Sequence, residues 1–394
     1  MAESGFDLHR AIGGTAGCRK LATVFYARVG QDPLLRPFFP GKTMKCAIEA
    51  FAAYLAQLFG GPAKDAQRRW WLSLRESHLR FNIGPAETAA WMNNMAGALA
   101  DVQMEEPVRA ALREFFDQAS AYLVNTEGAS TEAGKPIEPL NGVIPEEIAR
   151  RWNAQRELDE TVAAVRSGDA ERAIMLAGSS TLQSCYHRNR SVLAGLLGVM
   201  MDSSNDEMLR YVQKRIVADP ALVQERYRGR TLLHEASANC ILPVVKLLLQ
   251  LGADPNAPDG GSHTPLYCLA NQCTNSRAGD VVRTLVESGA HVNACGGVKR
   301  CTALHMAARR GNVEVAGALL DCGADIEAQD SLGETPLRRS VNCDKTQVAA
   351  LLLKRGADVH SKGSKGLTPL SAARSGGMKR LLGRLPAPTR NAAE

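Results

Sequence analysis

A short motif recurs five times in the C-terminal half of this chain at nearly constant spacing. Each copy begins with threonine and has leucine in third place, and the threonines stand 33, 38, 33 and 33 residues apart, at Thr231, Thr264, Thr302, Thr335 and Thr368. A unit of this length is one small supersecondary element that cannot bury its apolar face alone. Consecutive units must therefore stack, which predicts an elongated array of repeats.

Each copy of the motif carries the residues of a helix start. The threonine side chain caps the first helix, and the proline that follows in three copies fits its first turn. An apolar run of a second helix follows, and a glycine then ends that helix, at Gly252, Gly289, Gly323 and Gly356. Motif, period and helix pattern together resemble ankyrin repeats. The resemblance implies an α-solenoid over residues 229–385 that binds a protein partner, with a C-terminal tail at 386–394.

Other parts of the repeat region are less regular. Residues 148–228 contain several helical patterns that we interpret as diverged ankyrin-like repeats, and a separate helical spacer is the alternative. His234 and His305 occupy the fourth motif position, where we expect them to bond nearby backbone groups. Between the two halves, residues 127–147 are rich in Gly, Ser, Thr, Pro and Glu and are expected to form a linker.

His78 is one of two histidines in the first 126 residues, and it is surrounded by apolar positions such as Leu74, Leu79 and Phe81. A neutral imidazole in such a place is either a hydrogen-bonded packing residue or an axial ligand of haem iron. Taken alone, the packing role is the more common one. The surrounding sequence decides between the two.

The residues around His78 form an ordered series of short motifs. The series includes Phe25-Tyr26-Ala27-Arg28-Val29, Asp32-Pro33-Leu34-Leu35, Gly60-Gly61-Pro62, Arg75-Glu76-Ser77-His78 and Ala90-Trp91-Met92. Their order and spacing resemble a group II truncated haemoglobin, and the resemblance covers nearly all of residues 7–126. It implies an all-α, two-over-two globin domain at residues 1–126 that binds haem b.

The resemblance also implies roles for individual residues. His78 matches the proximal ligand of the iron, whereas Tyr26 and Trp91 match residues that face the bound gas. Ala47 falls where ordinary globins place a distal histidine, so it cannot coordinate. Apolar side chains at helical spacing are expected to wall the haem pocket, namely Phe39, Phe51, Leu55, Leu58, Leu74 and Phe81.

The chain departs from the family pattern next to the proximal histidine. Leu79-Arg80 replace the usual Ala-Pro, and Ser77 stands where many members carry a basic residue that helps to hold a haem propionate. Arg75 and Arg80 are expected to take over that pairing, because a guanidinium matches carboxylate geometry.

Composition limits the remaining possibilities. The net charge of +6 is spread thinly over 394 residues, with 14 basic and 12 acidic residues in 1–126, so no nucleic-acid partner is expected. The longest apolar run, residues 192–201, is too short to span a bilayer, and the N-terminus does not read as a signal peptide. The ten cysteines show no Cys-x-x-Cys pattern, and we expect free thiols in the cytoplasm.

Three functions are compatible with these features. The leading hypothesis is a haem protein that reversibly binds dioxygen or another diatomic gas, as a carrier or a sensor, while its ankyrin repeats bind a protein. The alternative is a haem-dependent nitric oxide dioxygenase or peroxidase, which would need an external reductase because no flavin or nicotinamide motif is present. A scaffold that has lost haem binding is the third, and the intact series from Tyr26 to Trp91 argues against it.

Overall fold

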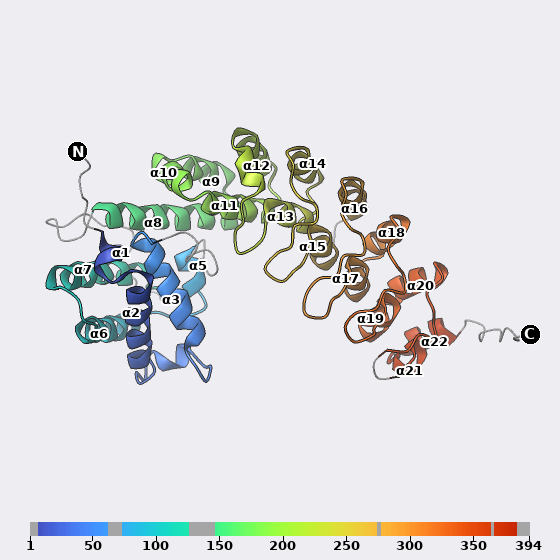
Figure 1. The fold of residues 1–394 in the computed structure, drawn as a ribbon, viewed down its shortest axis with the longest axis horizontal. Coiled ribbons are helices and arrows are strands. Elements are labelled where there is room, and N and C mark those ends of the chain that lie inside the picture. Colours follow the sequence, from blue (N-terminus) through green and yellow to red (C-terminus); the bar gives the residue numbers. More distant parts are fainter. Residues whose placement is uncertain (1–6, 62–72, 126–145, 274–276, 364–365, 384–394) are drawn as a thin grey trace, which may run out of the picture. The chain divides into compact units, whose positions relative to one another are not determined.

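The computed structural model describes residues 7–61, 73–125, 146–273, 277–363 and 366–383. Within these ranges the regular structure is helical, apart from two isolated bridges, Tyr227 with Arg230 and Gly296 with Cys301. The expected all-α class is therefore confirmed (Figure 1). The chain divides into two compact units, Met1–Leu196 and Leu197–Glu394.

The first unit begins with two pairs of helices. The pairs are α2 (Gly14–Val29) with α3 (Lys45–Leu58), and α6 (Pro85–Asp101) with α7 (Glu106–Tyr122); α2 also packs against α6. This is the two-over-two arrangement expected from the sequence. Among the described residues, three short elements accompany these pairs, namely α1 (Leu8–Ala11), η1 (Arg36–Phe38) and α5 (Leu74–His78).

The aspartate of the motif Asp32-Pro33-Leu34-Leu35 holds the turn that follows α2. Its carboxylate accepts hydrogen bonds from the backbone N–H groups of Leu34 (2.9 Å) and Leu35 (3.0 Å), and from the side-chain amide of Asn94 on α6 (2.6 Å). These bonds lower the pKa of Asp32 although desolvation opposes the shift. The turn after α2 is thereby fastened to α6.

Three further described helices lie wholly within the first unit. They are α8 (Glu146–Ser167), α9 (Ala170–Ala177) and α10 (Ser180–Arg188), and α8 packs against both of the others. The boundary between the units falls inside α11 (Arg190–Asp202). The interpretation of residues 148–228 as diverged repeats stays a prediction, but α8 to α10 share a compact unit with α2, α3, α6 and α7. The expected linker lies outside the described residues except at its last two positions, which begin α8.

The second unit is a stack of helix pairs. Along it the first helices α13, α15, α17, α19 and α21 pack in succession, as do the second helices α14, α16, α18, α20 and α22. The first helices are α13 (Leu232–Ala238), α15 (Pro265–Gln272), α17 (Ala303–Arg310), α19 (Pro336–Asn342) and α21 (Pro369–Ala372). The second helices are α14 (Leu242–Gln250), α16 (Ala278–Glu287), α18 (Val313–Asp321), α20 (Thr346–Lys354) and α22 (Gly376–Gly383). They are preceded by α12 (Asp206–Ala218) and η4 (Pro220–Val223). Residues 384–394, which include the expected tail, lie outside the described ranges.

The helix starts and helix ends predicted for the repeats are present in the structure. Thr264, Thr302, Thr335 and Thr368 cap their helices through the side-chain oxygen, and the four helix-ending glycines have φ between +85° and +95°. His234 accepts the N–H of Thr231 at Nδ1 (3.1 Å) and donates from Nε2 to the carbonyl oxygen of His263 (3.1 Å). His305 repeats this pattern two motifs later. Both histidines therefore bond backbone, as expected.

One expectation about cysteine is corrected. Cys240 and Cys273 form a disulfide, whereas the sequence led us to expect free thiols throughout. The two residues are 33 apart, which is one repeat, so they occupy the same position in successive repeats, with Cα atoms 6.1 Å apart. The other eight cysteines all lie in the described ranges, and none of them forms a disulfide there.

None of the described helices is long and apolar enough to cross a membrane.

Candidate haem site

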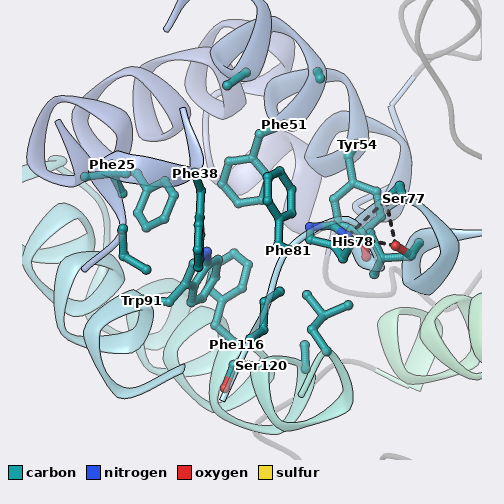
Figure 2. A pocket seen from close by; sticks show the side chains of 18 of the residues that line it. Phe25, Phe38, Phe51, Tyr54, Ser77, His78, Phe81, Trp91, Phe116 and Ser120 are labelled. Atoms are coloured by element: carbon teal, nitrogen blue, oxygen red, sulfur yellow. Dashed lines mark hydrogen bonds between the residues drawn. The ribbon is translucent and has the colours of Figure 1, made fainter. Parts of the chain in front are cut away.

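A cavity lies between the helix pairs of the first unit. Its walls come mainly from α2, α3, α5, α6 and α7. Residues of η1, of the segments that follow η1 and α5, and Trp152 of α8 also contribute to the lining. Most of the lining side chains are aromatic or aliphatic. In the view of Figure 2, Phe25, Phe38 and Trp91 lie on one side and His78 on the other, with Phe51 and Phe81 between them. An apolar slot with few polar groups is the environment in which proteins hold haem.

His78 is held in one orientation by its own helix. Its Nδ1 lies 2.7 Å from the carbonyl oxygen of Leu74 and 2.9 Å from the hydroxyl oxygen of Ser77. A carbonyl oxygen only accepts, so Nδ1 carries the proton and Nε2 has a free lone pair. The imidazole edge that bears Nε2 is turned away from Ser77, toward the middle of the cavity (Figure 2).

The surroundings also keep His78 neutral. Burial lowers its pKa, the positive charge of Arg80 lowers it further, and the hydrogen bond to Leu74 opposes them without reversing the shift. A neutral imidazole with one nitrogen committed to a carbonyl is the form that ligates a metal through the other nitrogen.

The short helix α5 is supported at both ends. At its start, the Ser73 hydroxyl oxygen accepts the N–H of Glu76 (3.0 Å). Beyond its end, the side-chain amide of Asn125 donates to the carbonyl oxygens of Phe81 (2.8 Å) and His78 (3.3 Å). Asn125 also exchanges two hydrogen bonds with the backbone of Ile83. A five-residue helix is too short to be stable alone, so these contacts fix the position of His78.

On the opposite side of the cavity lie the two residues expected to face a gas. The ring of Tyr26 packs edge-on against Phe39 (5.3 Å between centroids) and Phe51 (6.1 Å), and Trp91 packs against Phe51 (6.4 Å) and Phe25 (5.1 Å). Burial raises the pKa of Tyr26, so its phenol stays protonated and can donate a hydrogen bond.

Nine of the twelve residues singled out for the site in the sequence line the cavity. They are Tyr26, Phe39, Ala47, Phe51, Leu74, His78, Arg80, Phe81 and Trp91.

Leu55, Leu58 and Arg75 are not among the lining residues. Ala47, Phe51, Tyr54 and Gln57 form the side of α3 that faces the cavity, whereas Leu55 and Leu58 are buried in the core of the unit, Leu58 in the last turn of α3. Arg75 extends over the ring of Tyr122, 5.7 Å from its centroid, and so leaves the cavity wall. Arg80 lines the cavity and lies over the ring of Phe81 (4.6 Å).

Tyr54 and Trp152 are among the lining residues that were not assigned to the site from the sequence. Tyr54 is partly buried on α3, but its hydroxyl oxygen is buried and has no hydrogen-bond partner among the described residues. An unpaired buried hydroxyl is costly, so it marks a place where a bound group with a polar edge would fit. Trp152 lies beyond the globin motifs, and its helical spacing from buried Ile148 was the available signal. The aromatic walls, the free Nε2 and this orphan hydroxyl together fit a haem.

A helical cavity with aromatic walls and one buried imidazole whose Nε2 faces the cavity is typical of a globin-type haem site. The model of the bacterial-like globin family matches residues 7–125. Group 2 truncated hemoglobin YjbI of Bacillus subtilis (strain 168) is 31% identical over 106 residues, which cover 27% of this chain and 80% of that protein. The chain belongs to the truncated globin family through this segment, and family membership implies haem binding.

The second unit is also recognised. A model of ankyrin repeats matches three overlapping stretches, 196–295, 269–363 and 304–383. Ankyrin repeat and SOCS box protein 16 of Homo sapiens is 35% identical over 124 residues, 32% of this chain and 26% of that protein. Transient receptor potential channel pyrexia of Drosophila melanogaster is 34% identical over 128 residues, 32% of this chain and 13% of that protein. The chain therefore spans about a quarter or less of the length of these two relatives.

Proposed function

We propose that the first unit binds haem b through His78 and reversibly binds dioxygen or another diatomic gas on the opposite face. The observation that carries the proposal is the state of His78, with Nδ1 held by Leu74 and Nε2 free toward an aromatic cavity. A packing histidine would use both nitrogens within the protein, as His234 and His305 do in the repeats.

Haem supplies the reversible coordination of a diatomic gas, and the residues of the chain decide how firmly the gas is retained. Tyr26 is a protonated donor that can stabilise negative charge on a ligand. Trp91 donates only, so it supports the same charge without competing for the metal. Ala47 has no donor atom, which leaves the distal position accessible.

We further propose that the ankyrin unit binds a protein partner. Two projecting turns of the stack expose large apolar side chains, with Val298 fully exposed and Leu332 about half exposed. Ankyrin stacks use such projecting turns and the adjoining helix surface to hold other proteins.

Absorption spectroscopy of the full chain tests the haem proposal. Protein purified from haem-supplied cells is expected to show a Soret band with one haem per chain, and His78→Ala is expected to lose tight binding. His9→Ala is the matched control, because it removes the other histidine of the globin segment, and it should keep the band. Stoichiometric haem in the His78 variant would assign the axial bond to a different residue.

A further inference from the structure

Helix α8 lies beyond the globin family segment, yet it makes specific contacts with the globin helices. Arg151 donates to the carbonyl oxygen of Leu58 at the end of α3 (3.1 Å), and Gly60 leaves it room, since a Cβ there would lie 2.5 Å from the guanidinium. Arg166 forms an ion pair with Glu76 of α5 (3.0 Å). Trp152 packs edge-on against Phe115 of α7 (5.4 Å between centroids).

The central contact of α8 is made by Asp159. Each of its carboxylate oxygens accepts one backbone N–H of α5 and one side-chain donor. Oδ1 accepts from Leu74 N (2.9 Å) and from the amide of Gln155 (2.8 Å), and Oδ2 accepts from Arg75 N (3.1 Å) and from the hydroxyl of Tyr122 (3.1 Å). Four donors converge on a carboxylate that is only 3% exposed.

We infer that Asp159 is a positioning residue for the proximal histidine, an inference that rests on the proposed role of His78. Leu74 connects the two residues: its N–H donates to Asp159, and its carbonyl oxygen accepts the Nδ1 proton of His78. The partner of a metal-bound imidazole fixes the orientation of the ring and raises its basicity. By holding the first turn of α5, Asp159 sets the geometry of that partner.

The arrangement requires a carboxylate. Both oxygens face two donors each, so an asparagine at 159 would point its amide nitrogen at two donors in either orientation. Burial raises the pKa of Asp159, whereas its four hydrogen bonds oppose that shift. Because every neighbour in this set donates, the geometry matches the ionised form.

Asp159→Asn in the full-length haem protein tests the inference, with resonance Raman spectroscopy of the ferrous state as the main readout. We expect the iron–histidine stretching band to move to lower frequency, because a displaced Leu74 carbonyl weakens the bond to Nδ1. Haem transfer to an apoprotein scavenger is expected to be about 10- to 100-fold faster, the usual range for loss of such a supporting contact.

The matched control is Asp169→Asn. Asp169 caps the start of α9 by accepting the N–H of Arg172 (3.1 Å), and it makes this contact in the same unit but away from the cavity. Asp169→Asn should therefore leave the iron–histidine band and the rate of haem release unchanged. Should Asp159→Asn fail to fold, Tyr122→Phe removes a single donor to Oδ2 and is expected to shift the band in the same direction by a smaller amount.

The outcomes separate the two proposals. The positioning role would be overturned if the iron–histidine band had the same frequency in the unsubstituted chain and in Asp159→Asn, and if their rates of haem release agreed within twofold. That result would leave the proposed haem site intact. Absence of that band from the unsubstituted ferrous protein would overturn the proposed function, and the positioning role with it.

Discussion

Truncating Trp152 measures how much of the first unit depends on α8. The side chain is 2% exposed, and its ring meets those of Phe115 and Tyr122 at centroid distances of 5.4 and 5.7 Å. Removing roughly 200 Å² of buried aromatic surface costs about 5 kcal/mol at ~25 cal/mol per Å². Partial collapse of the vacated space recovers some of this, so Trp152→Ala is expected to lower the free energy of unfolding by about 3–5 kcal/mol.

Thermal unfolding followed at the Soret band reports this unit of the full chain. A domain of about 200 residues loses roughly 2–4 °C per kcal/mol, so the midpoint should fall by about 10 °C. Because Trp152 also lines the cavity, haem release should accelerate, and Trp152→Phe should recover much of both losses. Leu248→Ala, an equally buried truncation in the repeats, should leave the Soret midpoint unchanged. A shift below about 2 °C for Trp152→Ala would refute the packing of α8 on the globin helices.

Two further measurements address the gas-facing side and the repeats. Tyr26→Phe removes the phenol donor and should speed oxygen release by about 10- to 100-fold, measured by stopped-flow, since a hydrogen bond to a charged acceptor is worth about 1.5–3 kcal/mol. An unchanged rate would exclude Tyr26 as the donor. Burial lowers the pKa of His234 to about 4, so the unfolded chain binds its proton first as the pH falls. The free energy of unfolding of the repeats should therefore fall between about pH 6.5 and 4, by on the order of 3 kcal/mol from this residue. Urea titrations at several pH values should show that the free energy of unfolding falls less with decreasing pH in His234→Gln than in the unsubstituted chain. An equal fall in both proteins would contradict this role of His234.

The sequence predicted the repeats well because their signals are local. A threonine cap and a left-handed glycine act within one helix end, so each unit could be recognised without knowing its neighbours. The globin segment was recognised through an ordered series of motifs, and His78 came with it. The disulfide was missed because its partners are separated by a whole repeat, and only the stacking brings Cys240 beside Cys273.

The sequence could not predict which side of a helix faces the cavity or which distant residues pack against it. Leu55 and Tyr54 are adjacent on α3, and only the rotation of that helix decides that the tyrosine lines the cavity. The contacts of Trp152 and Asp159 with the globin helices join residues far apart in sequence, 85 residues in the case of Asp159 and Leu74. Such pairings follow from tertiary packing and not from helix propensity.

The contacts of α8 bear on how a gene for such a protein could be assembled. A crossover directly after residue 125 would preserve every motif of the globin family, yet it would discard Trp152 from the pocket wall and Asp159 from the start of α5. A transplanted globin that retains both supports must extend at least to Ser167, where α8 ends. The segment that can be exchanged intact between fusion proteins is thus longer than the segment by which its ancestry is recognised.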